Sequence, residues 1–313
     1  SWAVSSPPRI IVTEDEPAIA ELIAFTLRQG GYEPVAEVLF NELAVDAYFL
    51  EYDDARSGDF APLRFVPKGN LRIVLGVLQT SAHIERMSHN CVRTGRLAAD
   101  YPDVYIHSHV AENAAEIAWV RELFPGARSY LDVYDRFGLL RDRAIYAHCI
   151  HFDEADRRRM VSTGAAAAFC PTSNLFLGSG LFNLDASDAV GMRYALATDV
   201  GGGTSFSLLQ TMAAAHQIAQ LQQQRLHPLR AFYLATLGGA RMLGLDDRIG
   251  SFRSGREADF LVLDLAATPL IERRCRQART IGEKLMALMT LGDDRAVRET
   301  FILGQPAKSR LMR

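Results

Sequence analysis

The sequence predicts an α/β fold of the (β/α)8 TIM-barrel type, with a small β appendage near its C-terminal end. From Arg9 to about Asp199, short apolar runs alternate with amphipathic helical segments. Polar residues fall at the ends of several of these runs, and 313 residues suffice for one large α/β domain. In such a barrel the active site forms at the C-terminal ends of the strands. Polar residues at those ends are therefore the first candidates for function.

Eight segments are predicted strands, because buried parallel strands are short apolar runs bounded by helices or turns. They are residues 9–13, 33–38, 47–51, 71–77, 104–107, 144–148, 165–169 and 194–198. Helical patterns such as 17–29, 114–123 and 154–163 separate them, which is the alternation that a barrel needs. Further helical patterns follow at 205–223 and 228–243, and predicted strands at 260–263 and 298–303 form the appendage.

Composition and charge narrow the class of protein. The formal net charge is −3, so no global basic field attracts nucleic acid or an anionic membrane. No apolar run is long enough to cross a bilayer. The four cysteines are scattered without the spacing of a disulfide framework or a metal site, which fits a reducing cytoplasm. We therefore expect a cytoplasmic protein with a small-molecule substrate and no nucleic-acid or membrane partner.

Three strand ends carry residues that suit a metal ion. His109 follows the strand at 104–107, His148 ends the strand at 144–148, and Asp199 follows the strand at 194–198. Two imidazoles and a carboxylate are a donor set that zinc accepts. Glu112 lies three residues after His109, close enough to move protons for a metal-bound water. This combination predicts metal-assisted hydrolysis.

Longer motifs give these residues a family context. HSHVAEN (107–113), AHCIH (147–151), FCPTSNLFLGSGLFNL (169–184), ATDVGGGTSFSLLQT (197–211) and GREADFLVLDLAATPL (255–270) stand in the order found in one family of enzymes. Over about 100–305, the chain resembles the guanine deaminases, zinc enzymes of the amidohydrolase superfamily. The resemblance covers about two-thirds of the chain.

The resemblance implies a site and a reaction. It implies that His109, His148 and Asp199 bind zinc and that Glu112 and Asp199 form the proton-transfer pair. It places Asn174 and Gly203 in segments that border the substrate pocket. The implied reaction converts guanine and water to xanthine and ammonia, a step of purine catabolism.

The chain also departs from the guanine deaminases. Members of that family carry a zinc-binding His-x-His at the end of the first barrel strand, and none stands before His107 here. Their fourth strand ends in Thr-Pro-Arg-Phe, whose arginine holds the purine carbonyl, whereas residues 75–79 read LGVLQ. We therefore expect activity below that of the family, or none.

The N-terminal part resembles something different. Residues 9–36 resemble the opening of a response-regulator receiver domain, with Glu14 and Asp15 as its Mg²⁺-binding acidic pair and Glu51 where the phosphorylated aspartate belongs. We expect a hybrid: receiver-like βα units at 1–98 that form the first half of the barrel, an amidohydrolase half at 99–246 and a β appendage at 247–313. Glu14 and Asp15, or Glu51, are candidates to replace the missing metal ligands.

Two alternatives remain open from the sequence. Besides the deaminase itself, the chain is compatible with an inactive hybrid scaffold, or with a receiver-like signalling or binding module that carries a relic deaminase part. A half-barrel with a separate receiver leaves two parallel-strand edges unpaired unless a homodimer covers them.

Overall fold

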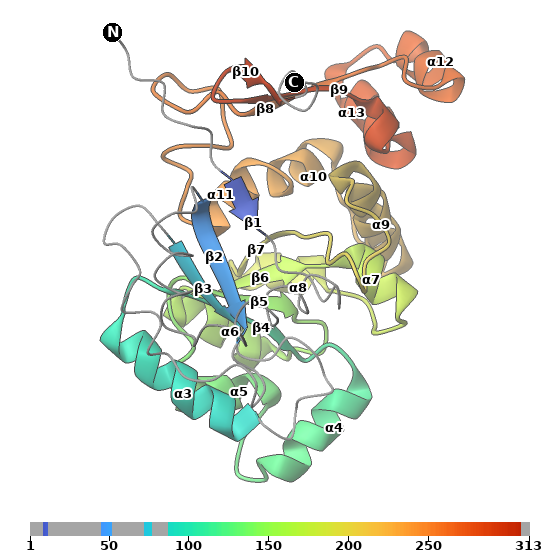
Figure 1. Cartoon of the computed structure of the whole chain (residues 1–313). Coiled ribbons are helices and arrows are strands. Elements are labelled where there is room, and N and C mark those ends of the chain that lie inside the picture. Colours follow the sequence, from blue (N-terminus) through green and yellow to red (C-terminus); the bar gives the residue numbers. More distant parts are fainter. Residues whose placement is uncertain (1–8, 12–44, 52–71, 77–86, 308–313) are drawn as a thin grey trace, which may run out of the picture. The chain divides into compact units, whose positions relative to one another are not determined.

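The computed structural model describes residues 9–11, 45–51, 72–76 and 87–307 (Figure 1). The chain divides into two units, one of residues 1–108 and 134–139 and the other of residues 109–133 and 140–313. Strand β4 (Tyr105–Val110) and helix α5 (Tyr130–Arg136) cross the boundary between the units. None of the described helices is long and apolar enough to span a membrane.

The first unit contains parallel strands. β1 (Arg9–Ile11), β2 (Val45–Glu51), β3 (Arg72–Gly76) and the start of β4 pair in this order. Helix α3 (Met87–Asp100) belongs to the same unit and buries its apolar face, with Met87 and Cys91 fully inaccessible. The hydroxyls of Ser108 and Tyr134 are hydrogen-bonded at 2.8 Å, which satisfies two polar groups in the interior of this unit.

Seven of the eight strands predicted for the barrel are present. The remaining one, the second in chain order at residues 33–38, lies outside the described residues. β1 pairs directly with β2, with Arg9 opposite Val45. Closure of an eight-stranded barrel stays a prediction.

The second unit contains the strands that matter most for function. β5 (Ala144–His148), β6 (Ala166–Phe169) and β7 (Arg193–Leu196) pair in parallel in this order. Their register aligns Ala147 with Ala168, and Ala168 with Ala195. The C-terminal ends of all three strands therefore lie at one edge of the sheet. β5 and β6 are buried along their whole length, as expected for strands covered by helices on both faces.

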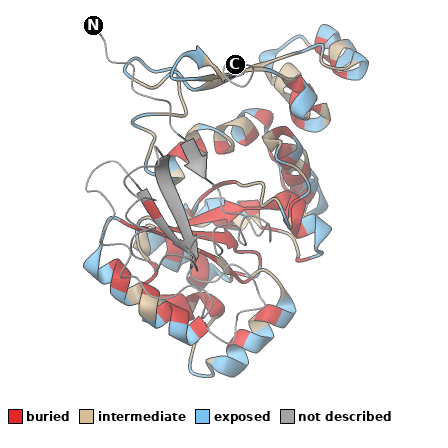
Figure 2. Ribbon diagram, in the orientation of Figure 1, coloured by how far each residue is buried: buried red, intermediate tan, exposed pale blue. Residues whose placement is uncertain are grey.

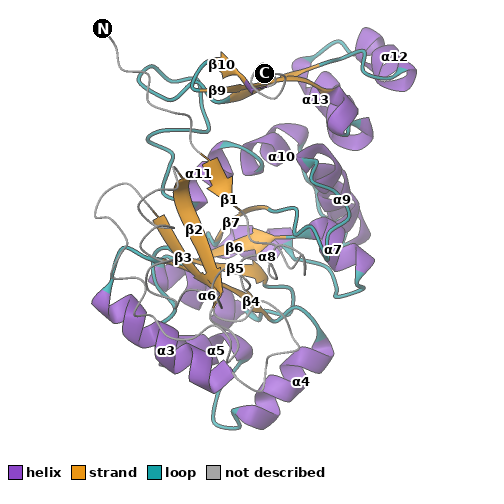
Figure 3. Cartoon of the chain, in the orientation of Figure 1, coloured by secondary structure: helices purple, strands orange, loops and turns teal. Residues whose placement is uncertain are grey.

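Helices separate these strands along the chain (Figure 3). α4 (Ala114–Leu123) follows β4, α6 (Glu154–Thr163) connects β5 to β6, and α7 (Pro171–Phe176) and α8 (Leu184–Val190) stand between β6 and β7. Several begin at a residue that the sequence makes recognisable. Asp153 caps α6 through a hydrogen bond to the backbone N–H of Asp156, and Gly164 ends the helix with φ of 75°, which glycine adopts without strain.

Many residues on the strands of the second unit are buried (Figure 2), and an aromatic cluster is part of this interior. The rings of Phe169 and Phe182 stack with centroids 4.6 Å apart, and Tyr194 packs against Phe182 at 5.3 Å. Phe182 is 1% exposed, and its backbone carbonyl accepts a hydrogen bond from the Gln222 side chain. The cluster joins β6, β7 and the segment before α8.

Three helices follow β7, and a small antiparallel sheet comes after them. α9 (Leu208–Leu221), α10 (Pro228–Leu234) and α11 (Leu237–Met242) lead to β8 (Phe260–Leu263). β8, β9 (Val297–Ile302) and β10 (Gln305–Pro306) form an antiparallel sheet in the order β10-β9-β8. The two strands predicted for the appendage are thus present.

Two helices stand between β8 and β9 that the sequence analysis did not anticipate. They are α12 (Pro269–Gln277) and α13 (Ile281–Leu291), and α13 packs against α9. Each is preceded by a capping threonine: Thr268 accepts a hydrogen bond from the N–H of Ile271, and Thr280 from that of Glu283. Thr-Pro-x-x-Glu at 268–272 is a recognisable helix start.

We expect replacement of Phe182 by alanine to lower the free energy of unfolding by about 3–5 kcal/mol, because it removes a buried ring and leaves a cavity. The Phe206→Ala variant is the control, since Phe206 is 76% exposed. Denaturant unfolding measures both. Equal, small losses in the two variants would contradict the assignment of Phe182 to the core.

Candidate metal centre and active site

The C-terminal ends of β4, β5 and β7 bring the predicted metal ligands together. His109 lies in β4, His148 ends β5 and Asp199 follows β7. One side-chain donor atom from each of the three lies within 4.8 Å of the others. The Nε2 atom of His148 is 3.7 Å from Oε2 of Glu112 and 3.9 Å from Oδ2 of Asp199. The three predicted ligands therefore converge, and the Glu112 carboxylate lies beside His148.

The backbone around these residues is unusual. Ala111, His148, Cys149 and Asp199 have φ of 50°, 71°, 52° and 49° respectively, although none is glycine. This left-handed conformation is unfavourable for side chains with a Cβ and persists where surrounding contacts hold it. Here the N–H of Cys149 donates to the carbonyl of Val110 at 3.1 Å, which ties the turn after β5 to the end of β4.

The environment of His148 prepares one nitrogen for a metal. The side chain is 1% exposed, and Nδ1 donates to Oδ1 of Asn174 at 2.9 Å. Nε2 is buried and has no hydrogen-bond partner. Burial, followed by the nearby His109, lowers the pKa of His148, so the neutral form with a lone pair on Nε2 is favoured. The two imidazole rings stack with centroids 5.1 Å apart.

The donor set fits a zinc ion. An unpartnered buried nitrogen, a second imidazole and a carboxylate converge, and zinc binds these atoms in sites that keep an open position for water. Two thiols in the same unit do not compete. Cys149 and Cys170 are buried, and burial raises their thiol pKa well above the usual value, so both stay protonated.

Glu112 is held in place by residues of two other segments. Its Oε1 accepts a hydrogen bond from the Ser179 hydroxyl at 2.8 Å, and its backbone N–H donates to Oε2 of Glu116 at 3.1 Å. Glu116 also completes a capping box with Asn113 at the start of α4. Burial raises the pKa of the Glu116 carboxyl.

Neither Glu116 nor Ser179 is among the site residues predicted from the sequence. The Asn-x-x-Glu spacing at 113–116 is the signal that could have identified Glu116. No local signal identifies Ser179, because its partner lies 67 residues away.

The two residues expected to border the substrate pocket have clear structural contacts. Asn174 is fully buried and hydrogen-bonds His148. The N–H of Gly203 donates to the carbonyl of Asp199, and a Cβ at position 203 would overlap the backbone oxygens of Thr198 and Asp199. Glycine is thus required for the turn that carries Asp199. Contact of either residue with substrate stays a prediction.

Other expected residues can be placed only in part. Glu14 and Asp15 lie outside the described residues, and Glu51 ends β2 in the first unit. His151 is exposed, yet its Nε2 donates to the carbonyl of Ser179 at 3.0 Å.

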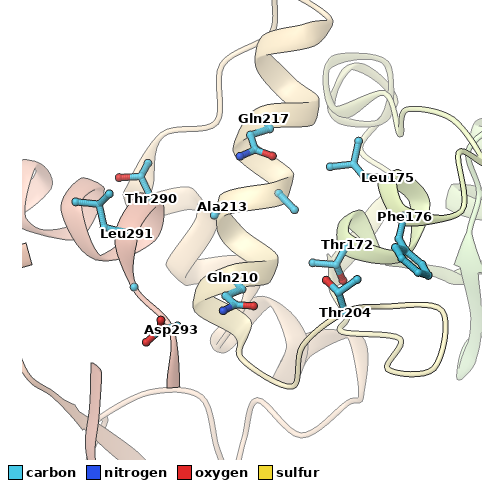
Figure 4. A pocket seen from close by; sticks show the side chains of 12 residues that line it. Thr172, Leu175, Phe176, Thr204, Gln210, Ala213, Gln217, Thr290, Leu291 and Asp293 are labelled. Carbon is cyan, nitrogen blue, oxygen red and sulfur yellow. The ribbon is translucent and has the colours of Figure 1, made fainter. Parts of the chain in front are cut away.

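A cavity of about 520 Å³ lies elsewhere in the second unit (Figure 4). Residues of α7, the loop before α9, α9, the end of α13 and the turn after α13 line it, among them Phe176, Gln210, Gln217 and Asp293. None of the four residues of the candidate site contributes to its lining.

With this geometry established, the family follows. The family model described as the amidohydrolase family matches residues 85–307, and the chain belongs to that family. The matched region includes all four residues of the candidate site. The comparisons lend no support to a receiver domain or to a hybrid chain.

Several proteins similar to this chain are guanine deaminases. The chain is 48% identical to guanine deaminase of Escherichia coli (strain K12) over 67% of this chain and 48% of that protein. A solved structure of E. coli guanine deaminase is similar with a TM-score of 0.71 at 33% identity, covering 90% of this chain and 77% of that one. An adenosine deaminase from Xanthomonas campestris with bound zinc reaches a TM-score of 0.62 at 26% identity, covering 76% of this chain and 52% of that one. The chain spans about half the length of the curated guanine deaminases it matches.

We expect added zinc to stabilise the protein, by about 2.7 kcal/mol at a free concentration a hundredfold above its dissociation constant. The His148→Ala variant should lose this stabilisation, because a buried ligand is removed. The matched control is His89→Ala, since His89 lies exposed on α3 outside the site. Thermal unfolding with zinc or EDTA measures the effect. A zinc-induced shift of equal size in His148→Ala would place the metal elsewhere.

We expect Asn174→Ala to weaken zinc binding about 10–100-fold, because its amide oxygen fixes the ring orientation and tautomer of His148. The control is Asn90→Ala, which also removes a buried asparagine but from α3. Calorimetric zinc titration compares the two variants. Unchanged affinity in Asn174→Ala would show that this hydrogen bond does not tune the ligand.

Proposed function

We propose that the protein is a zinc-dependent purine aminohydrolase of the guanine deaminase type, which converts guanine and water to xanthine and ammonia. The observation that carries the proposal is the convergence of His109, His148 and Asp199 with the Glu112 carboxylate beside them. The similarity to guanine deaminases over the region that supplies all four residues supports this substrate class.

Zinc, when bound by His109, His148 and Asp199, supplies Lewis-acid activation of water at neutral pH. The chain's own residues orient the ligand and move the protons. Asn174 holds the His148 ring so that Nε2 faces the site. Glu112, whose Oε2 faces His148, accepts a proton from the attacking water and gives it to the purine ring nitrogen. Asp199 helps to deliver a proton to the departing ammonia.

One contact to the substrate that guanine deaminases make is missing here. The arginine that guanine deaminases direct at the purine carbonyl has no counterpart in residues 75–79. Each unmet polar group of a bound purine costs about 1–3 kcal/mol, so we propose activity below the family level. The alternative is an inactive scaffold that retains the metal site. No observation favours the receiver-like module.

The domain organisation belongs to the same proposal. We infer that residues 99–246 form the catalytic half of an eight-stranded barrel, that residues 1–98 supply strands of its other half, and that residues 247–313 form the appendage. Parallel strands that are buried on both faces need neighbouring strands on both edges, and a closed barrel supplies them. A homodimer is the other way to cover an open edge.

We expect the purified protein to form xanthine from guanine, and EDTA to abolish the reaction. Glu112→Gln should lower kcat about 10²–10⁴-fold while zinc still binds, because the amide cannot transfer the proton. The control is Glu122→Gln, an exposed position on α4. Absorbance of xanthine follows the reaction. Turnover that resists EDTA would exclude the zinc mechanism, and no turnover by the wild-type protein would favour the inactive scaffold.

A further inference from the structure

The Glu112 carboxylate has one oxygen tied and one oxygen facing the site. Oε1 accepts the hydrogen bond from the Ser179 hydroxyl at 2.8 Å, and Oε2 lies 3.7 Å from Nε2 of His148. Ser179 is 8% exposed, so water competes little for this bond. A hydrogen bond to a carboxylate in such surroundings is stronger than one between neutral groups.

Ser179 is itself fixed through its backbone on both sides. Its N–H donates to the carbonyl of Asn174 at 3.0 Å, and its carbonyl accepts from Nε2 of His151 at 3.0 Å. The next residue, Gly180, has φ of 136°, and a Cβ there would lie 2.8 Å from Cγ2 of Ile150. Only glycine allows the chain to pass this close to the turn after β5. The backbone that carries the Ser179 hydroxyl is therefore held in place while the hydroxyl donates to Glu112.

Asn174 connects this anchoring to the metal ligand. Its side chain accepts from Nδ1 of His148, and its backbone carbonyl accepts from the N–H of Ser179. A single segment, residues 174–180, thus orients both the buried histidine and the carboxylate beside it. The two groups cannot shift independently as long as these hydrogen bonds persist.

We propose that Ser179 is a positioning residue for Glu112, an inference that rests on the proposed function. Its hydroxyl fixes the rotation of the carboxylate and occupies Oε1, which leaves Oε2 as the oxygen that exchanges the proton. Ser179 does not touch the reacting atoms. Its removal should impair the proton-transfer step and leave the binding of substrate and zinc intact.

The test compares Ser179→Ala with Ser179→Thr, which keeps a hydroxyl, and with the matched control Ser187→Ala. Ser187 is 1% exposed and donates to the carbonyl of Asn183 at 2.8 Å, so its removal also deletes a buried hydroxyl bond, but on α8. Each variant is crystallised with zinc, titrated with zinc by calorimetry and assayed for guanine deamination.

We expect the Glu112 carboxylate to rotate away in Ser179→Ala and to keep its place in the other two variants. We expect kcat to fall about 10–100-fold in Ser179→Ala, the range for losing one hydrogen bond to a charged group, with KM and zinc affinity within about twofold. Ser179→Thr should recover most of kcat. Ser187→Ala should lower the free energy of unfolding and leave kcat and zinc affinity unchanged.

A Glu112 carboxylate that keeps its place in Ser179→Ala crystals would overturn the proposal, as would an unchanged kcat. If the wild-type protein shows no turnover, the proposed function fails by itself. The crystallographic comparison then still decides whether Ser179 orients Glu112, because it does not depend on activity.

Discussion

The candidate site depends first on the register of β5, β6 and β7. Parallel strands end at the same edge of a sheet, and the alignment of Ala147, Ala168 and Ala195 brings the residues that follow to one place. A one-residue slip of β5 would turn His148 to the other face of the sheet. The alanine-rich run 165–168 of β6 is fully buried, so helices can pack closely on this part of the sheet and exclude water. The register therefore fixes which side chains can meet.

Left-handed backbone at the strand ends is the second requirement. Strain of about 1–3 kcal/mol at each such residue persists only where neighbouring contacts outweigh it. Here the contacts are backbone hydrogen bonds: Cys149 to Val110, His151 to Ala111, and Gly203 to Asp199. They couple the loops after β4 and β5 to each other and fix the turn that carries Asp199. The strained residues flank or include the proposed ligands, which is where strain is expected to serve function.

Electrostatics follow from this geometry. A histidine that is buried, stacked on a second imidazole and hydrogen-bonded through Nδ1 is poorly protonated, so its second nitrogen is free to bind a cation. The carboxylates of Glu112 and Asp199 approach that nitrogen from two loops. Without a cation between them, these groups gain little from their proximity. A divalent metal ion satisfies all of them at once.

Seven of the eight barrel strands, the order His109, Glu112, His148 and Asp199 along the chain, and the family could all be predicted from the sequence. These features are encoded locally, as short apolar runs followed by polar residues and by motifs of fixed spacing. The sequence also contained signals that went unread, such as the capping residues Asn113, Thr268 and Thr280.

The remaining features depend on the folded chain. Which strands pair directly, such as β1 with β2, depends on contacts between distant segments rather than on local pattern. The contact of Ser179 with Glu112 spans 67 residues, and that of Asn174 with His148 spans 26. A serine or an asparagine looks the same in the sequence whether it faces solvent or a residue of the candidate site. Its role is set by which segments the folded chain brings together, and the loop conformations that do so are held by backbone hydrogen bonds that no side-chain pattern records.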